Sequence, residues 1–140
     1  MSDTAMQDER QHMRQYFVDT WHKREQYTRL SALEQQILDV IHMHPEYQTA
    51  LNTSKILDKD YSSDNNPFLH MSLHLGLLEQ LNTDRPTGIR NIYQKLFEKF
   101  TDEHKVQHIM MDIMAEIIWD AQQQHKLPDE ALYLQKLLNL

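Results

Sequence analysis

The sequence predicts an all-α protein, a single compact helical bundle of five to six helices. Only 2 of the 140 residues are glycine and only 4 are proline, so few positions favour turns. Hydrophobic residues also recur every three or four positions along most of the chain, as in helices with one buried face. A chain of this length can bury roughly two-thirds of its unfolded surface in one domain. We therefore expect a disordered N-terminal tail at residues 1–5 and a single helical domain at residues 6–140.

The charge balance and composition exclude several classes of function. Lys and Arg total 14, whereas Asp and Glu total 21, so the net charge is −7 with neutral histidine. Nucleic acids and anionic membranes attract cationic surfaces, and we expect neither as a partner. The composition is compatible with a homo-oligomer and identifies no protein partner. The lack of cysteine excludes thiol catalysis and cysteine-bound zinc. A polar N-terminal segment, and no apolar run near the roughly 20 residues of a membrane span, predict a cytoplasmic location.

Three helices are expected in the N-terminal half. The first runs from residue 6 to about Lys23. Its apolar residues at four-residue spacing are Met13, Phe17 and Trp21. The stretch Ser31-Ala32-Leu33-Glu34 has the spacing of a capping box and starts the second helix. Pro45 disfavours helical geometry at the residue before it, so this helix ends near His44, and a short helix continues to about Leu51.

The central helix is predicted at about residues 67–82. Asn66 has the character of an N-cap, and Pro67 suits the first helical position. On a helical wheel, His70 and His74 lie in the middle of the apolar face, four residues apart. The leucines on either side of this pair are Leu77, Leu78 and Leu81. An interior pair of histidines indicates a buried polar site.

A turn at residues 83–88 and a helix at 89–100 lead to a long helix at about 102–125, with Thr101 as its cap. We expect the central helix to pack against this long helix. Four polar residues at steps of four positions line one edge of the long helix: His104, His108, Asp112 and Glu116. A short last helix begins near Pro128.

The placement of the histidines predicts an internal metal site. Side chains at positions i and i+4 of a helix are neighbours, with Cβ atoms about 5–6 Å apart. Two such imidazoles can direct ring nitrogens at one ion. The predicted ligands are His44, His70, His74, His108 and Glu116. Alternative or supporting groups are Glu46, Tyr47, His104 and Asp112. Histidine and carboxylate ligands suit a divalent transition metal such as Zn, Fe, Mn or Ni.

Other functions are compatible with the same residues. In one, the buried histidines form a structural hydrogen-bond network, satisfied by carboxylates or backbone carbonyls, in a non-enzymatic acidic adaptor or interaction protein. Acid–base chemistry by a histidine near Glu116, and haem binding, are further alternatives. The H-E-x-x-H motif, the nucleophile elbow and the phosphate-binding loop are all absent. The sequence therefore names no catalytic residue and does not decide whether the protein is an enzyme.

Several motifs in a fixed order also resemble one family. They are His44-Pro45-Glu46-Tyr47, Asn66-Pro67-Phe68-Leu69-His70 with His74 and Glu79-Gln80, Asp84-Arg85-Pro86 with Gly88-Ile89, His108 with Met111, Asp112 and Glu116, and Trp119 with Ala121-Gln122. They resemble the bacterial family catalogued as domain of unknown function 1841, over the chain from Tyr16 to Leu138. In that family we expect a glutamate where Asp112 stands, so the reach of this side chain is shorter here. The resemblance implies a small helical bacterial protein and no mechanism, because the family has no established activity.

Overall fold

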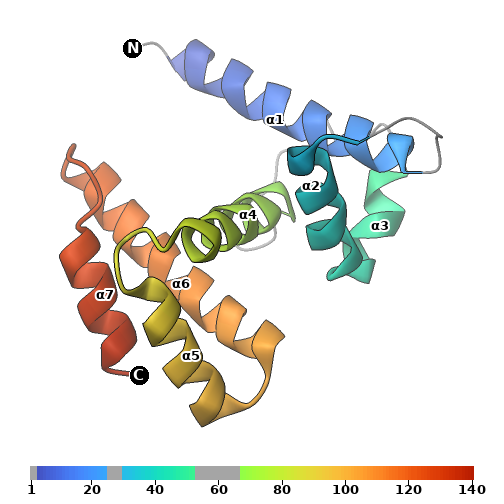
Figure 1. Cartoon of the computed structure of the whole chain (residues 1–140). Coiled ribbons are helices and arrows are strands. Elements are labelled where there is room, and N and C mark those ends of the chain that lie inside the picture. Colours follow the sequence, from blue (N-terminus) through green and yellow to red (C-terminus); the bar gives the residue numbers. More distant parts are fainter. Residues whose placement is uncertain (1–2, 25–29, 53–66) are drawn as a thin grey trace. The chain divides into compact units, whose positions relative to one another are not determined.

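The structure, a computed structural model, describes residues 3–24, 30–52 and 67–140. Within these ranges the chain forms seven helices and no strand (Figure 1). The helices are α1 (Asp3–Lys23), α2 (Ala32–His42), α3 (Pro45–Leu51), α4 (Pro67–Thr83), α5 (Ile89–Phe100), α6 (Glu103–Gln123) and α7 (Glu130–Leu138). The all-α prediction is confirmed. The expected number of five to six helices is too low, because each of the seven segments expected above forms a helix of its own.

The chain divides into two compact units, Met1–Ser72 and Leu73–Leu140. The boundary lies within α4, which continues through it without a break. Unit 1 therefore contains α1, α2, α3 and the first residues of α4, and unit 2 contains the rest of α4 with α5, α6 and α7. The expected division into a tail and a single domain at residues 6–140 stays a prediction, and α1 begins at Asp3, inside the predicted tail.

Unit 1 is built on the packing of α2 against α1 and α3. The capping box at the start of α2 is confirmed, since the Ser31 side chain accepts a hydrogen bond from the Glu34 N–H and the Glu34 carboxylate accepts one from the Ser31 N–H. The apolar side of this unit includes the buried residues Phe17, Trp21, Ile37, Ile41, Leu51 and Phe68. Met13, expected on the same stripe, is 46% exposed, so the buried face of α1 is shorter than its four-residue spacing predicts.

Unit 2 has one apolar core, to which every one of its helices contributes. Its buried members are Leu77, Ile89, Ile92, Leu96, Val106, Met110, Met111, Met114, Ile117, Tyr133 and Leu137. In this unit α6 packs against both α5 and α7 (Figure 1). The unit 2 part of α4 contacts α6 through the hydrogen bond from Gln80 to the Met114 sulfur at 3.4 Å. The predicted packing of the central helix on the long helix is confirmed here.

The starts of the helices in unit 2 differ from the prediction at one residue. The N-cap of α6 is Asp102, whose side chain accepts a hydrogen bond from the Lys105 N–H. Thr101, the expected cap, instead ends α5 in a left-handed conformation with φ 59°. A carboxylate caps the positive end of the α6 dipole as well as a hydroxyl would, and it carries a charge. The predicted N-cap of α4, Asn66, lies outside the described residues.

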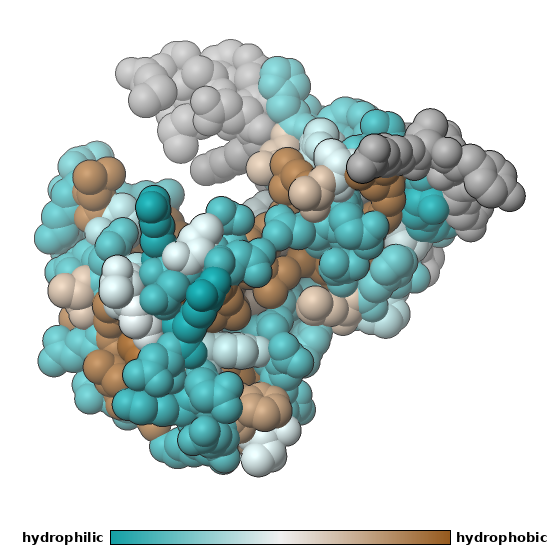
Figure 2. Space-filling model, viewed as in Figure 1, coloured by the Kyte–Doolittle hydropathy of each residue, from teal (hydrophilic) through white to brown (hydrophobic). Residues whose placement is uncertain are grey.

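The face of the molecule drawn in Figure 2 is mostly polar. On the face drawn in Figure 2, hydrophilic side chains predominate and hydrophobic ones form separate patches. Along the described segments, no helix combines the length and the apolar character needed to cross a membrane.

Candidate functional site

In unit 1, two histidines approach each other, one from α4 and one from the two-residue connection between α2 and α3. His44 is 1% exposed and lies directly before Pro45, where the helix breaks. Its Nε2 lies 2.9 Å from Nε2 of His70, and the two rings meet edge to face with centroids 4.6 Å apart. Pro45 thus has a structural consequence: by ending α2, it allows the His44 ring to turn inward toward α4.

A backbone carbonyl fixes the orientation of the His44 ring. His44 Nδ1 lies 2.7 Å from the carbonyl oxygen of Val40, one turn earlier on α2. A carbonyl oxygen only accepts hydrogen bonds, so Nδ1 carries the proton and donates it. The lone pair of the neutral ring is then on Nε2, which faces His70. The ring is anchored at one nitrogen and presents the other, which is the usual arrangement of metal-binding histidines.

Tyr47 completes this part of the site. Its ring stacks on His44, with centroids 5.3 Å apart and an interplanar angle of 17°, and also lies against His70. Burial raises the pKa of the Tyr47 hydroxyl, and the nearby Glu46 carboxylate raises it further. Because both effects disfavour the phenolate, Tyr47 provides a ring wall more readily than an anionic ligand.

In unit 2, three histidines gather between α4 and α6. His74 is fully buried on α4, and its ring meets the His104 and His108 rings with centroids 5.9 and 5.7 Å away. His104 and His108 are one turn apart on α6, with centroids at 4.1 Å. His74 Nε2 also contacts the side-chain oxygen of the buried Gln107. Three of the predicted site residues, His74, His104 and His108, therefore lie together in unit 2.

Chemically, each unit supplies imidazole rings, and an imidazole nitrogen can bind a metal ion. In unit 1 the pair is His44 and His70, and in unit 2 His74 lies beside His108. Imidazole nitrogen is a suitable ligand for zinc, iron and nickel. His104 is a further candidate through its contacts with His74 and His108.

The predicted carboxylates are all exposed. Glu116, two turns beyond His108 on α6, is exposed and pairs with Lys136 of α7. Asp112 and Glu46 are exposed as well. The spacing of the acidic residues along α6 follows from the sequence, but their side chains face water or a lysine.

Sequence reasoning did not identify Gln107. This residue precedes Met111 by four positions and Met114 by seven, so it belongs to the apolar face of α6. A glutamine in that stripe is the signal that could have pointed to it, since a buried amide requires polar partners. Its partners are His74 and Tyr93.

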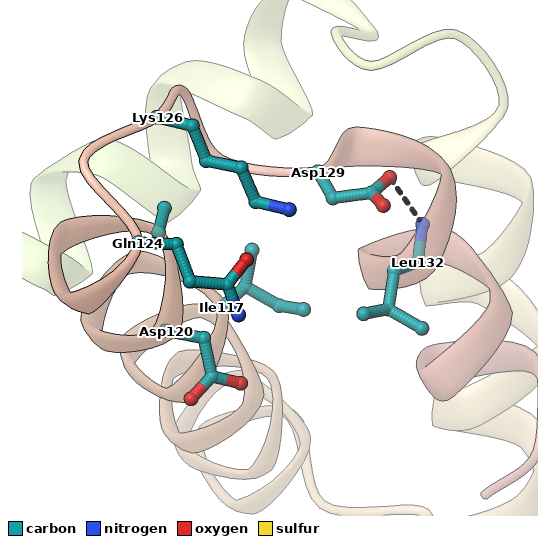
Figure 3. A pocket seen from close by; sticks show the side chains of 7 residues that line it. Ile117, Asp120, Gln124, Lys126, Asp129 and Leu132 are labelled. Atoms are coloured by element: carbon teal, nitrogen blue, oxygen red, sulfur yellow. Dashed lines mark hydrogen bonds between the residues drawn. The ribbon is translucent and has the colours of Figure 1, made fainter.

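A small cavity of about 80 Å³ lies between the end of α6 and the start of α7 (Figure 3). It is lined by Ile117, Asp120, Ala121, Gln124, Lys126, Asp129 and Leu132. In Figure 3 the Asp129 carboxylate turns to the Leu132 N–H, which it caps at 3.0 Å. None of the histidines described above lines this cavity, so it is a separate feature of unit 2.

Comparisons with known proteins identify a family and no characterised relative. The sequence model of the family described as Domain of unknown function (DUF1841) matches residues 9–139, nearly the whole chain. No curated protein matches the chain, and no solved structure does.

Proposed function

The chain belongs to the DUF1841 family, and because that family's description assigns no activity, we propose a function from the chain's own histidines. They bind one divalent transition metal ion, with His44, His70, His74 and His108 as ligands. Zinc, iron, manganese and nickel are the candidates, and the absence of cysteine disfavours metals that prefer sulfur. The sequence-based expectation of a cytoplasmic bacterial protein is part of this proposal.

The observation that carries the proposal is the anchoring of His44. Its Nδ1–H is held by the Val40 carbonyl, which leaves Nε2 as the presented nitrogen. Backbone carbonyls hold metal-binding histidines in this way, because the hydrogen bond fixes both the tautomer and the ring plane.

The positions of His70 and His74 support a shared ion. They lie one turn apart on the continuous helix α4, and imidazoles at this spacing can bind the same metal at about 2.0–2.1 Å. Each has a further histidine beside it, His44 next to His70 and His108 next to His74. Four nitrogen ligands complete a tetrahedral shell.

Glu116 and Asp112 are not needed as ligands in this proposal. The Glu116 carboxylate forms a salt bridge with the Lys136 ammonium. A site of neutral imidazoles keeps the full positive charge of the ion. Polarisation of a substrate oxygen would require a fifth coordination position beside the four imidazoles. Any hydrolytic or redox activity would depend on this charge.

Metal analysis of the purified protein tests the proposal. The protein should be prepared without a histidine tag and analysed for Zn, Fe, Mn and Ni, and then titrated with Co²⁺ and Zn²⁺. We expect one ion per chain, and a melting temperature that rises with added metal, since a metal present at 100 times its dissociation constant stabilises the folded state by about 2.7 kcal/mol. His44→Gln should weaken binding, whereas His12→Gln, at an exposed position on α1, should not.

The structural-network alternative makes the opposite prediction. If the histidines only satisfy hydrogen bonds, His74→Ala lowers the free energy of unfolding by about 1–3 kcal/mol, because buried Gln107 loses its hydrogen bond to His74. This loss is the same with or without a chelator. Wild-type protein that holds no stoichiometric metal and melts at the same temperature with and without added Zn²⁺ would contradict the metal proposal and favour this one.

A further inference from the structure

A chain of hydrogen bonds leads from the first turn of α6 to the buried ring of His74. Glu103 Oε1 accepts a hydrogen bond from the Tyr93 hydroxyl at 3.1 Å. That hydroxyl accepts one from Gln107 Nε2 at 3.3 Å. Gln107 Oε1 lies 2.5 Å from His74 Nε2. All four residues belong to unit 2, and we call this series the Glu103–His74 chain.

The direction of each bond follows from the chemistry of the groups. An ionised carboxylate only accepts hydrogen bonds, so Tyr93 donates to Glu103. Burial raises the pKa of Tyr93, so its hydroxyl keeps the proton that it donates. The hydroxyl oxygen then accepts from the amide NH₂ of Gln107, which directs the amide oxygen toward His74. Because that oxygen only accepts, His74 Nε2 must carry a hydrogen.

We propose that the Glu103–His74 chain fixes His74 as the Nε2–H tautomer and makes Nδ1 its metal-binding atom. Gln107 and Tyr93 are then positioning residues that act through His74. The metal part of this inference rests on the proposed function, whereas the tautomer belongs to the protein itself.

The same reasoning gives His44 the opposite tautomer. Its Nδ1–H is held by Val40, and the lone pair is on Nε2. The proposed site would therefore use Nδ1 of one histidine and Nε2 of another. Such a mixed set distinguishes this prediction from a site in which all rings bind through the same nitrogen.

The tautomers are measured by long-range ¹H–¹⁵N spectra of the ¹⁵N-labelled full chain without metal. At about pH 8, ordinary histidines are neutral, and each ring shows which nitrogen carries the proton. We expect Nε2–H for His74 and Nδ1–H for His44. A His74 signal with the proton on Nδ1, or with the averaged shifts of an exposed histidine such as His12, overturns the inference.

Two tyrosine variants test whether the Glu103–His74 chain determines the tautomer of His74. Tyr93→Phe removes the hydroxyl that orients Gln107, and the amide can then present either end, so His74 should become a mixture of tautomers. Tyr133→Phe is the matched control, because it also removes a hydroxyl bonded to a glutamine, at 2.9 Å from Gln80 Oε1 in the same unit. If the tautomer of His74 is unchanged in Tyr93→Phe, or changes equally in Tyr133→Phe, the Glu103–His74 chain does not determine it.

Metal affinity provides a second measurement. Loss of a group that orients a metal ligand typically costs about 10–100-fold in affinity, and we expect this loss of Co²⁺ affinity for Gln107→Leu. Tyr133→Phe, which removes a hydrogen bond to Gln80 rather than to Gln107, should stay within about twofold of wild type. If the wild type binds no Co²⁺ or Zn²⁺, the proposed function fails, and the tautomer of His74 in the metal-free protein still decides this inference.

Discussion

Glu34 shows how one side chain connects two helices of unit 1. Its Oε1 accepts a hydrogen bond from the Ser31 N–H at 3.0 Å at the start of α2, and its Oε2 lies 3.1 Å from Lys23 Nζ at the end of α1. The Ser31 backbone N–H, and after it the Lys23 ammonium, lower the pKa of the Glu34 carboxyl. The same contact raises the pKa of Lys23. Both shifts show that the ionised pair is favoured in the folded state.

This shift predicts a pH-dependent contribution to stability. A carboxyl with a lowered pKa in the folded state stabilises the protein above its unfolded pKa, and the contribution is lost as the pH falls through the lower folded value. Glu34→Gln keeps the capping box, because glutamine also serves at this position, but it removes the charge. We expect Glu34→Gln to be less stable than wild type in urea at pH 7, and the difference to disappear on acidification.

The control for this comparison is Glu98→Gln, which removes an exposed carboxylate on α5. Its effect at pH 7 should be smaller. A difference between wild type and Glu34→Gln that persists unchanged below the lowered pKa of Glu34 would contradict the assignment to its charge.

At the scale of the elements, the two glycines of the chain have opposite roles. Gly88 precedes α5 with φ 97°, a conformation that side chains with a Cβ rarely adopt. Gly76 lies inside α4, and a Cβ there would meet the Met114 Cε at 3.8 Å, an ordinary contact. The turn before α5 requires glycine, whereas α4 tolerates it.

Alanine substitutions at these glycines should therefore change stability in opposite directions. Gly76→Ala should raise the free energy of unfolding by about 0.5–1 kcal/mol, because glycine weakens a helix interior by that amount. Gly88→Ala should lower it by about 1–2 kcal/mol, the cost of the left-handed conformation for a residue with a Cβ. Urea denaturation followed by circular dichroism measures both changes in the free energy of unfolding. If the two changes have the same sign, the opposite roles of Gly76 and Gly88 are refuted.

At the scale of the whole molecule, two compact units are joined through one helix. Since α4 contributes residues to both units, the loss of one unit removes packing from a helix that the other also uses. The sequence-based prediction of a single domain then implies cooperative unfolding of the described helices.

Calorimetry of the metal-free protein, with a chelator present, tests this cooperativity. Ile37→Ala in unit 1 and Leu137→Ala in unit 2 each truncate a fully buried side chain, at an expected cost of about 2–5 kcal/mol. We expect one transition, shifted to lower temperature in both variants. Two transitions, with each variant lowering a different one, would show that the units unfold separately.

Much of the helix pattern could be predicted from the sequence because it depends on local interactions. The ends of α3 and α5 match the prediction, and Pro45 and the Ser31–Glu34 capping box determine how α2 ends and begins. These signals act within four residues, the range over which helical hydrogen bonds and caps operate. The spacing of His70 and His74 on one helix follows from the same regularity.

The partners of the site residues depended on contacts distant in sequence. Gln107 is 33 positions from His74, and Lys136 is 20 positions from Glu116. Periodicity shows which face of a helix is apolar, but it does not show which polar side chain of another helix will meet that face. For this reason the sequence analysis predicted neither Gln107 beside His74 nor the pairing of Glu116 with Lys136.

The sequence by itself thus determined the all-α class, the main helices and the histidines one turn apart, because each depends on backbone periodicity and neighbouring side chains. Only the tertiary structure decided that Met13 is exposed, that Glu116 pairs with Lys136 and that Gln107 holds His74. A side chain's burial and hydrogen-bond partner depend on the helix that packs against it, and residues far along the chain supply that helix.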